Sequence, residues 1–176
     1  MAVEIFLKIG DGTSANGIPG DSTDNVHKGE ISIIAYYWGE TVNGGRAAGA
    51  AAGPGGGAGK VALQDFRFSA YVGLASQGLF SACATGKHFS TAVLNVRKAG
   101  TTTDFLRVTL ADVFVSSFQM GNNLLDAGTY SPLVGAASAP IDQFSLNFGK
   151  INFQYAAQGV TGAGGQLGTG GVTVGG

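Results

Sequence analysis

The chain has few of the residues on which most functional classes depend. Its single cysteine, Cys83, cannot form an intramolecular disulfide, so folding in an oxidising compartment is not implied. Only 12% of the residues are charged, about half the usual share. The net charge of −1 gives no field that would steer the protein to nucleic acid or to an anionic membrane. So little charge predicts instead that other subunits cover much of the surface.

Long hydrophobic runs are also lacking. No apolar stretch approaches the length of a membrane-spanning helix. The first residues, 1–6, have neither the basic region nor the apolar run of a secretory signal peptide. We therefore expect no membrane partner, synthesis in the cytoplasm, and any export to proceed without a standard signal peptide.

Metal-binding side chains are scarce. His27, His88 and Cys83 are the only imidazole and thiol groups, and a zinc site would need a fourth ligand and tighter spacing. We expect no metal. Cys83 is interpreted as a small buried group on a helix, and His88 as a structural hydrogen-bonding residue.

Two Gly-Lys pairs resemble phosphate-binding loops but depart from the pattern. Lys60 is followed by Val61 instead of serine or threonine, and Gly86-Lys87 follows a predicted helix instead of opening one. No spacing selects a nucleophile with a histidine and a carboxylate, and the acidic residues are scattered. The sequence therefore predicts no catalytic residue, no cofactor and no enzyme activity.

Alternating hydrophobicity predicts a mainly β protein. In the first strand, Val3, Ile5, Leu7 and Ile9 share one side and Glu4, Phe6 and Lys8 the other. Further strands are predicted at 30–38, 61–68, 89–98, 104–118 and 142–156. One helix is expected, with Ser76 as N-cap, Gly86 as its end, and Leu79, Phe80 and Cys83 on one side.

Two of the strands change the phase of their alternation. Leu110 gives way to Val113, and Phe148 gives way to Ile151, which predicts a bulge in each strand. Bulges bend strands, as closing a sheet on itself requires. The predicted fold is a small antiparallel β-barrel or sandwich with one packed α-helix. Asp65 and Asp112 are interpreted as bulge or turn residues, with an ion pair to Lys60, Arg97 or Lys98 as the alternative.

The chain divides into one domain and a tail. Residues 1–158 form the β-barrel domain, within which 39–60 is an extended Gly/Ala-rich loop that is too flexible for a helix and too apolar for a solvated linker. Something is therefore expected to cover that loop. Residues 159–176 are a Gly-rich C-terminal tail without a charged residue.

Six short motifs follow one another in a fixed order along the chain. They are His27–Ile31, Gly57–Val61 with Gln64–Phe66, Ala82–His88, Val96–Gly100, Val113–Ser117 and Ser145–Phe148. Together they resemble the Hcp family, the haemolysin-coregulated proteins that form the inner tube of type VI secretion systems. This resemblance covers residues 2–158 and implies a fold like that of phage tail tubes.

The resemblance also implies a function. A member of this family is a structural tube subunit, made in the bacterial cytoplasm, whose homohexameric rings stack head to tail and are secreted. Its partners would be further copies of itself, with sheath, spike and effector proteins. We predict that Gly55, Gly56, Gly57, Ala58 and Gly59 form the ring-stacking loop, because small residues allow backbones to approach closely. Lys60, Arg97 and Lys98 are predicted at subunit contacts.

One position departs from the family pattern at the end of the second predicted strand. The family pattern there is aromatic, small polar, Trp, Gly, whereas this chain has Tyr36-Tyr37-Trp38-Gly39. If Tyr37 faces the lumen, it makes the channel more aromatic and changes its cargo preference. Effector binding that Tyr37→Ser leaves unchanged would count against this hypothesis.

Two alternatives remain at this point. The unusual loops and the uncharged tail would also suit a free-standing extracellular tube or filament that polymerises without a sheath. A binding module or chaperone acting as an isolated ring is the third reading, and it predicts rings that never stack.

Overall fold

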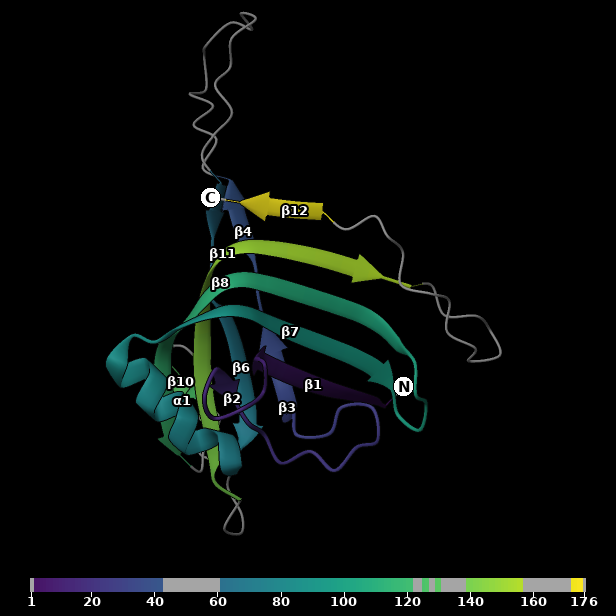
Figure 1. Ribbon diagram of the computed structural model, residues 1–176. Helices are drawn as coiled ribbons and strands as arrows, with labels where there is room; N and C mark the ends of the chain where they lie inside the picture. Colours follow the sequence, from purple (N-terminus) through teal and green to yellow (C-terminus); the bar gives the residue numbers. More distant parts are fainter. Residues whose placement is uncertain are drawn as a thin grey trace, which may run out of the picture.

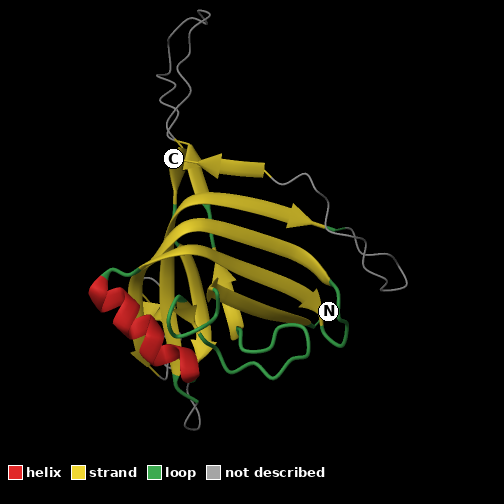
Figure 2. Cartoon of the chain, viewed as in Figure 1, coloured by secondary structure: helices red, strands yellow, loops and turns green. Residues whose placement is uncertain are grey.

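The computed structural model describes residues 2–42, 61–121, 125–126, 129–130, 139–156 and 172–175. Over these ranges the chain forms strands and one helix, α1 (Figures 1 and 2). In chain order the elements are β1 (Val3–Gly10), β2 (Gly17–Ile18), β3 (Ile31–Tyr37), β4 (Glu40–Val42), β5 (Val61–Leu63), β6 (Phe66–Tyr71), α1 (Leu74–Thr85), β7 (His88–Lys98), β8 (Asp104–Gly121), β9 (Leu125–Asp126), β10 (Thr129–Tyr130), β11 (Ile141–Tyr155) and β12 (Val172–Gly175).

The main sheet closes on itself. Its strands pair antiparallel in the order β11-β6-β3-β1-β7-β8, and β8 returns to pair with β11. The result is a closed six-stranded antiparallel barrel with α1 across one end, as the alternating pattern predicted (Figure 1). Closure leaves these strands with few open edges.

The barrel interior holds the hydrophobic core. Leu7 and Ile9 of β1 are fully buried there, while Ile5 is partly buried and Val3 is exposed. Opposite residues of an antiparallel pair point to the same side of the sheet. The inward-facing side chains of β7, β8 and β11 therefore pack with those of β1 and β6 inside the barrel. The predicted inward face of the first strand is therefore confirmed from Ile5 to Ile9.

Three neighbouring strands bend at one place. β8 keeps a constant register with both β7 and β11 on either side of Asp112, which has a φ of 55° and lies against Gly149. The bulges predicted at the two phase changes are therefore wrong, because β8 and β11 change phase together. Their actual bulge lies between Ser145 and Leu146. Figure 1 shows both strands curving strongly along their length.

The helix begins earlier than predicted. Gly73 is the N-cap, and Ser76 lies in the first turn, where its Oγ accepts a hydrogen bond from the Gly73 amide at 2.9 Å. The predicted end at Gly86 is confirmed by a left-handed φ of 63°. Leu79 is fully buried, but Phe80 is 62% exposed and meets the Phe118 ring edge-on, with ring centroids 6.1 Å apart.

Two Gly-rich segments include strands. The predicted loop 39–60 begins with one, since Glu40–Val42 pairs with Val61–Leu63 as a two-stranded ribbon. Within the Gly-rich tail, Val172–Gly175 pairs with Lys150–Phe153 of β11. β6 pairs with β11 only as far as Leu146, so this edge of β11 is open to another strand.

Candidate assembly surfaces

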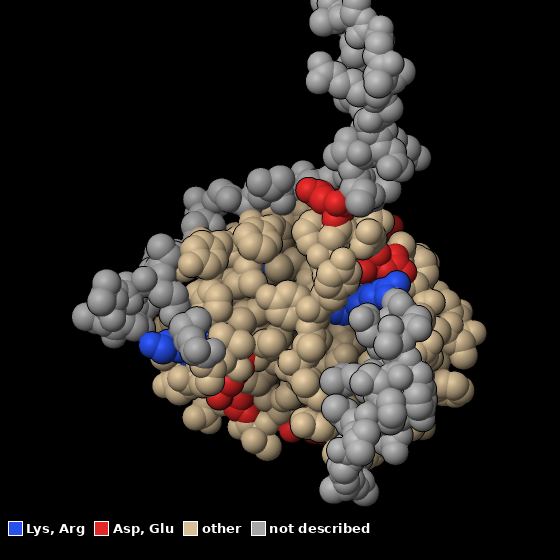
Figure 3. Space-filling model, turned by 180° about the vertical axis from the view of Figure 1, so that it is seen from behind, with Lys and Arg blue, Asp and Glu red and all other residues tan. Residues whose placement is uncertain are grey.

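One outer face of the barrel, here called the open sheet face, carries side chains that are exposed or half-buried except for the buried Ser145. Two cross-strand rows make it, and each runs over β3, β6, β11 and β8: Tyr37, Arg67, Ser145 and Ser117 in the first, and Ala35, Ser69, Gln143 and Gln119 in the second. These side chains are small or polar except for Tyr37 and Arg67. Figure 3 likewise shows a described surface that is largely neither basic nor acidic.

Tyr37 lies on this face, although simple alternation along the strand would place it on the opposite side. The alternation placed Tyr37 on the same side as Ile33, but the register with β6 shifts between Ile33 and Ala35. That bulge turns Tyr37 outward, where it is 63% exposed, while Trp38 stacks on Phe66 in the core. Burial raises the pKa of the neighbouring Tyr36. Of the seven residues of β3, only Ile31 and Ile33 are buried in the single subunit.

Polar side chains form a hydrogen-bonded cluster at one end of the open sheet face. Asp65 follows β5, and its carboxylate accepts hydrogen bonds from Ser116 at 2.6 Å and from Asn147 at 2.8 Å. Ser145 bridges Ser116 and Ser117 at 2.7 and 2.6 Å. Ser116 is the extra residue of the β8 bulge, so the cluster holds the bulge in place, and Asp65 is the bulge-associated residue that was predicted.

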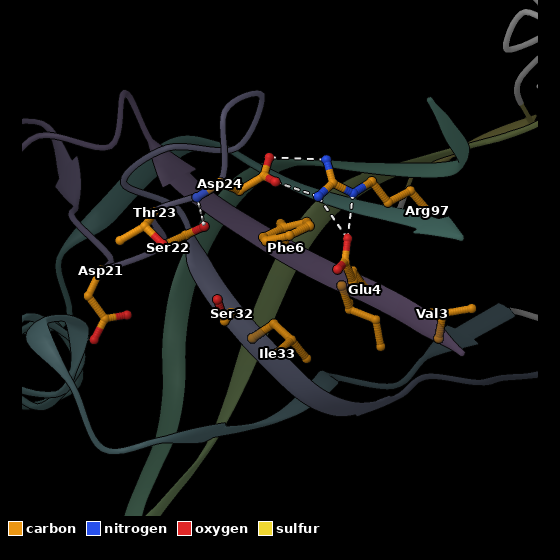
Figure 4. Close-up of a pocket in the computed structure, with 11 residues that line it drawn as sticks. Val3, Glu4, Phe6, Asp21, Ser22, Thr23, Asp24, Ser32, Ile33 and Arg97 are labelled. Atoms are coloured by element: carbon orange, nitrogen blue, oxygen red, sulfur yellow. Dashed lines mark hydrogen bonds and ion pairs between the residues drawn. The ribbon is translucent and has the colours of Figure 1, made fainter. Parts of the chain in front are cut away.

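A second surface is a groove of about 520 Å³ outside β1 and β3 (Figure 4). Arg97 of β7 lies at its side and is only 5% exposed. The guanidinium bonds Glu4 Oε2 from Nε at 2.8 Å and from Nη2 at 2.7 Å. It also donates to both carboxylate oxygens of Asp24 and lies 5.0 Å from the centre of the Phe6 ring. Arg97 therefore fastens the segment before β3 to β1 and β7.

These charges shift one another's ionisation. The hydrogen bonds from Arg97 hold the pKa of Asp24 well below its usual range, with further help from the His27 amide. The same hydrogen bond with Asp24 raises the pKa of Arg97. Asp24 and Arg97 are therefore both charged at neutral pH.

A second buried network lies beside the first. His27 is 3% exposed and stacks on Phe6 with ring centroids 4.5 Å apart. Its Nδ1 lies 3.0 Å from Glu30 Oε2, and its Nε2 lies 3.0 Å from Asp104 Oδ1. Two ionised carboxylates can only accept, so this geometry needs a proton on both ring nitrogens or on one carboxyl. Burial raises the pKa of Glu30, and the charge of His27 opposes that rise.

Sequence reasoning missed both networks. It treated His27 only as a metal ligand to be excluded and predicted Arg97 at a contact between subunits. The partners lie far away in sequence: Arg97 meets Glu4 and Asp24, and His27 meets Asp104. The only local signal was His27-Lys28-Gly29-Glu30, because Gly29 has a φ of 75° and a turn there brings His27 to Glu30.

Of the other residues predicted at assembly contacts, some lie outside the described ranges and one lies within them. Gly55, Gly56, Gly57, Ala58, Gly59 and Lys60 lie outside the described residues. Lys98 is half-buried at the end of β7, next to Arg97. In the ranges that the structure describes, no group of three or more His, Cys, Asp and Glu side chains could hold a metal ion.

Comparison with known proteins decides the family. The sequence model of the family described as "Type VI secretion system effector, Hcp" matches residues 6–155. The chain is 35% identical over 165 residues to Protein hcp1 of Pseudomonas aeruginosa, covering 93% of this chain and 89% of that protein. This chain belongs to the Hcp family.

Solved structures agree with the Hcp assignment. Hcp1 from Salmonella typhimurium is 29% identical, with a TM-score of 0.65, over 98% of this chain and 93% of that one. A structure of a type six secretion system protein has a TM-score of 0.80 at 22% identity, over 99% of this chain and 96% of that one. At that identity the second likeness shows the fold alone.

Membership of the Hcp family makes the chain a structural tube subunit of a type VI secretion system, as the six motifs predicted. The Hcp motifs lie at points of packing and register: His27 and Arg97 in the buried networks, Gly86 at the helix end, and Ser145 at the bulge. No helix in the described part of this Hcp protein is long and apolar enough to cross a membrane.

Proposed function

We propose that six copies of this chain form a ring, that the rings stack head to tail into the secretion tube, and that the open sheet face lines the lumen. The observation that carries this proposal is the exposure of Tyr37 on a broad sheet face that is nearly free of charge. A monomer in water would expose more charge on such a face. Within a tube, the same face would be screened from bulk solvent and available to cargo.

Stacking is assigned to the loop between β4 and β5. A run of small residues from Gly55 to Gly59 permits close backbone approach to a neighbouring ring. Head-to-tail contacts are heterologous and do not close, so they extend into a filament. Lys60 and Lys98 contribute subunit contacts. Arg97, whose charge is already paired within the chain, contributes through the surface that it holds together.

The proposed role involves assembly and transport without bond chemistry. The tube carries effectors in its lumen and binds sheath and spike proteins. It is assembled in the cytoplasm and leaves the cell through the secretion system. No catalytic step is assigned to any residue. Stiffness during ejection comes from the closed barrel, and disassembly after delivery comes from stacking contacts that a small-residue loop makes weak.

A free-standing tube is the second candidate, and the tail favours it. Val172–Gly175 adds a strand to the open edge of β11, and the same antiparallel pairing on an adjacent subunit would lock subunits together. If so, a chain ending at Gln158 would form rings but no tubes. A secretion tube that is guided by a sheath predicts equal stacking with and without the tail.

The stacking loop has a direct test. Gly57→Trp places a bulky ring where close approach is required, so negative-stain electron microscopy should show rings of normal diameter that do not stack. Gln77→Trp, at an exposed position on α1, is the matched control and should leave the tubes unchanged. Tubes of normal length from Gly57→Trp would refute the assignment of the loop.

A further inference from the structure

Arg67 is the one cationic side chain in the two rows of the open sheet face. It is exposed in the middle of β6, with Tyr37 of β3 on one side and Ser145 of β11 on the other. Among the described residues, no ion pair or hydrogen bond engages its guanidinium. Arg67 therefore differs from Arg97 and Arg107, whose guanidinium groups both bind carboxylates of the same subunit.

The nearest acidic side chain along the strand forms no ion pair with Arg67. Asp65 is two residues before Arg67, and its two carboxylate oxygens accept hydrogen bonds from Ser116 and Asn147. No carboxylate belongs to the two rows. Arg67 is thus the one charged side chain of the two rows, and Asp65, just outside them, weakens its field without pairing with it.

We propose that Arg67 makes the open sheet face a binding site for carboxylate-bearing segments of cargo polypeptides. Guanidinium groups match carboxylates in a bidentate geometry, and Tyr37, which pairs with Arg67 across β3 and β6, brings a second hydrogen-bonding side chain to the same face. This inference rests on the proposed function, because only a ring brings the copies of Arg67 around one lumen. There they act together, so a weak contact per subunit becomes a substantial one per ring.

The selectivity of this site follows from the same surroundings. Because no carboxylate of the rows balances Arg67, a lysine-rich segment would meet only like charge and uncharged groups. Neutral segments would gain hydrogen bonds without the charge-assisted contribution. The expected cargo preference is therefore acidic over neutral over basic.

The test uses the full-length protein assembled as rings, with fluorescein-labelled glutamate and lysine homopeptides as probes. Fluorescence anisotropy should show that the glutamate peptide binds at low salt and is released at high salt. Arg67→Gln should weaken its binding about tenfold, since one contact is lost from every subunit of the ring. Arg67→Glu should transfer the binding to the lysine peptide.

Lys150→Gln is the matched control, because it removes the same charge from an exposed position of β11 beyond the bend. It should bind the glutamate peptide as the unmodified protein does. Equal affinities of the Arg67→Gln and Lys150→Gln rings would overturn the proposal. A thymidine oligonucleotide bound as tightly as the peptide, with the same dependence on Arg67, would also overturn it in favour of nucleic acid.

Sedimentation of each variant separates this inference from the proposed function. If Arg67→Gln dissociates the rings, Arg67 is a subunit contact and the cargo proposal is wrong. If the unmodified protein forms no rings, the proposed function itself fails. Intact rings with a selective loss of peptide binding support both.

Discussion

Replacing Arg97 by methionine should destabilise the folded subunit strongly. Methionine keeps much of the aliphatic length of the side chain but removes the positive charge from a site that is 5% exposed. Glu4 and Asp24 then face each other across the groove without a cation, and the contact with the Phe6 ring is lost.

The size of the effect follows from how deeply the contact is buried. Removing one partner of a fully buried ion pair costs roughly 3–5 kcal/mol. The Glu4 side chain is 40% exposed and can recover hydration, so the loss here should be smaller. With the lost cation–π contact included, we expect unfolding to become easier by about 3 kcal/mol.

Urea titration with tryptophan fluorescence measures this loss directly. Trp38 is the only tryptophan and packs against the core, so it reports unfolding of the barrel. A loss of that size should lower the urea midpoint by roughly 1–2 M. Lys98→Met, the neighbouring lysine, is the control and should shift the midpoint little. A midpoint of Arg97→Met equal to that of the control would refute the view that Arg97 acts mainly within its own subunit.

Three further outcomes are expected. Asp142→Asn should raise the urea midpoint at pH 7 but not near pH 3. Burial raises the pKa of Asp142 above its ordinary 3.8, so the carboxyl destabilises the folded state only at pH values at which it ionises. Equal effects at both pH values would contradict this. Gly20→Ala should cost about 1–3 kcal/mol because the added Cβ would collide with the Glu30 backbone, whereas Gly73→Ala should cost little because only the end of the exposed Asp21 side chain is in its way; urea titration of both variants checks this. Asp112→Gly should gain up to about 1 kcal/mol by relieving the left-handed backbone at a φ of 55°, whereas Asp112→Ala should not; thermal unfolding of both variants checks this.

Much of the barrel was predictable because its strands alternate clearly. The predicted segments near 89–98, 104–118 and 142–156 correspond to β7, β8 and β11, and Gly86 ends the helix as a left-handed glycine. Local periodicity carries this information because each strand buries one face against the core.

Features that depend on partners in other strands were not predictable. Whether a phase change is a bulge or a shared bend depends on the opposite strand: at Asp112 both strands bend together, whereas at Ser145 only one strand has an extra residue. The side on which Tyr37 lies depends in the same way on the register of β3 with β6. The helix starts at Gly73 instead of Ser76, since Ser76 lies in the first turn, where its Oγ accepts from the Gly73 amide and its own amide donates to the Gly73 carbonyl.

The candidate surfaces, too, were predictable only where the signal lies within a single strand. Tyr37 could be singled out from the sequence as a departure from the family pattern, and the structure shows that it is exposed. The significance of Arg67 could not be, since it depends on which residues of three other strands lie beside it. The family was accessible from short motifs because those motifs fix packing points that the fold needs.

Negative-stain electron microscopy of the full-length protein over a range of concentrations, with sedimentation alongside, tests the central claim most directly. We expect six-membered rings that stack into tubes as the concentration rises. Single subunits that persist at every concentration, without rings or tubes, would contradict it.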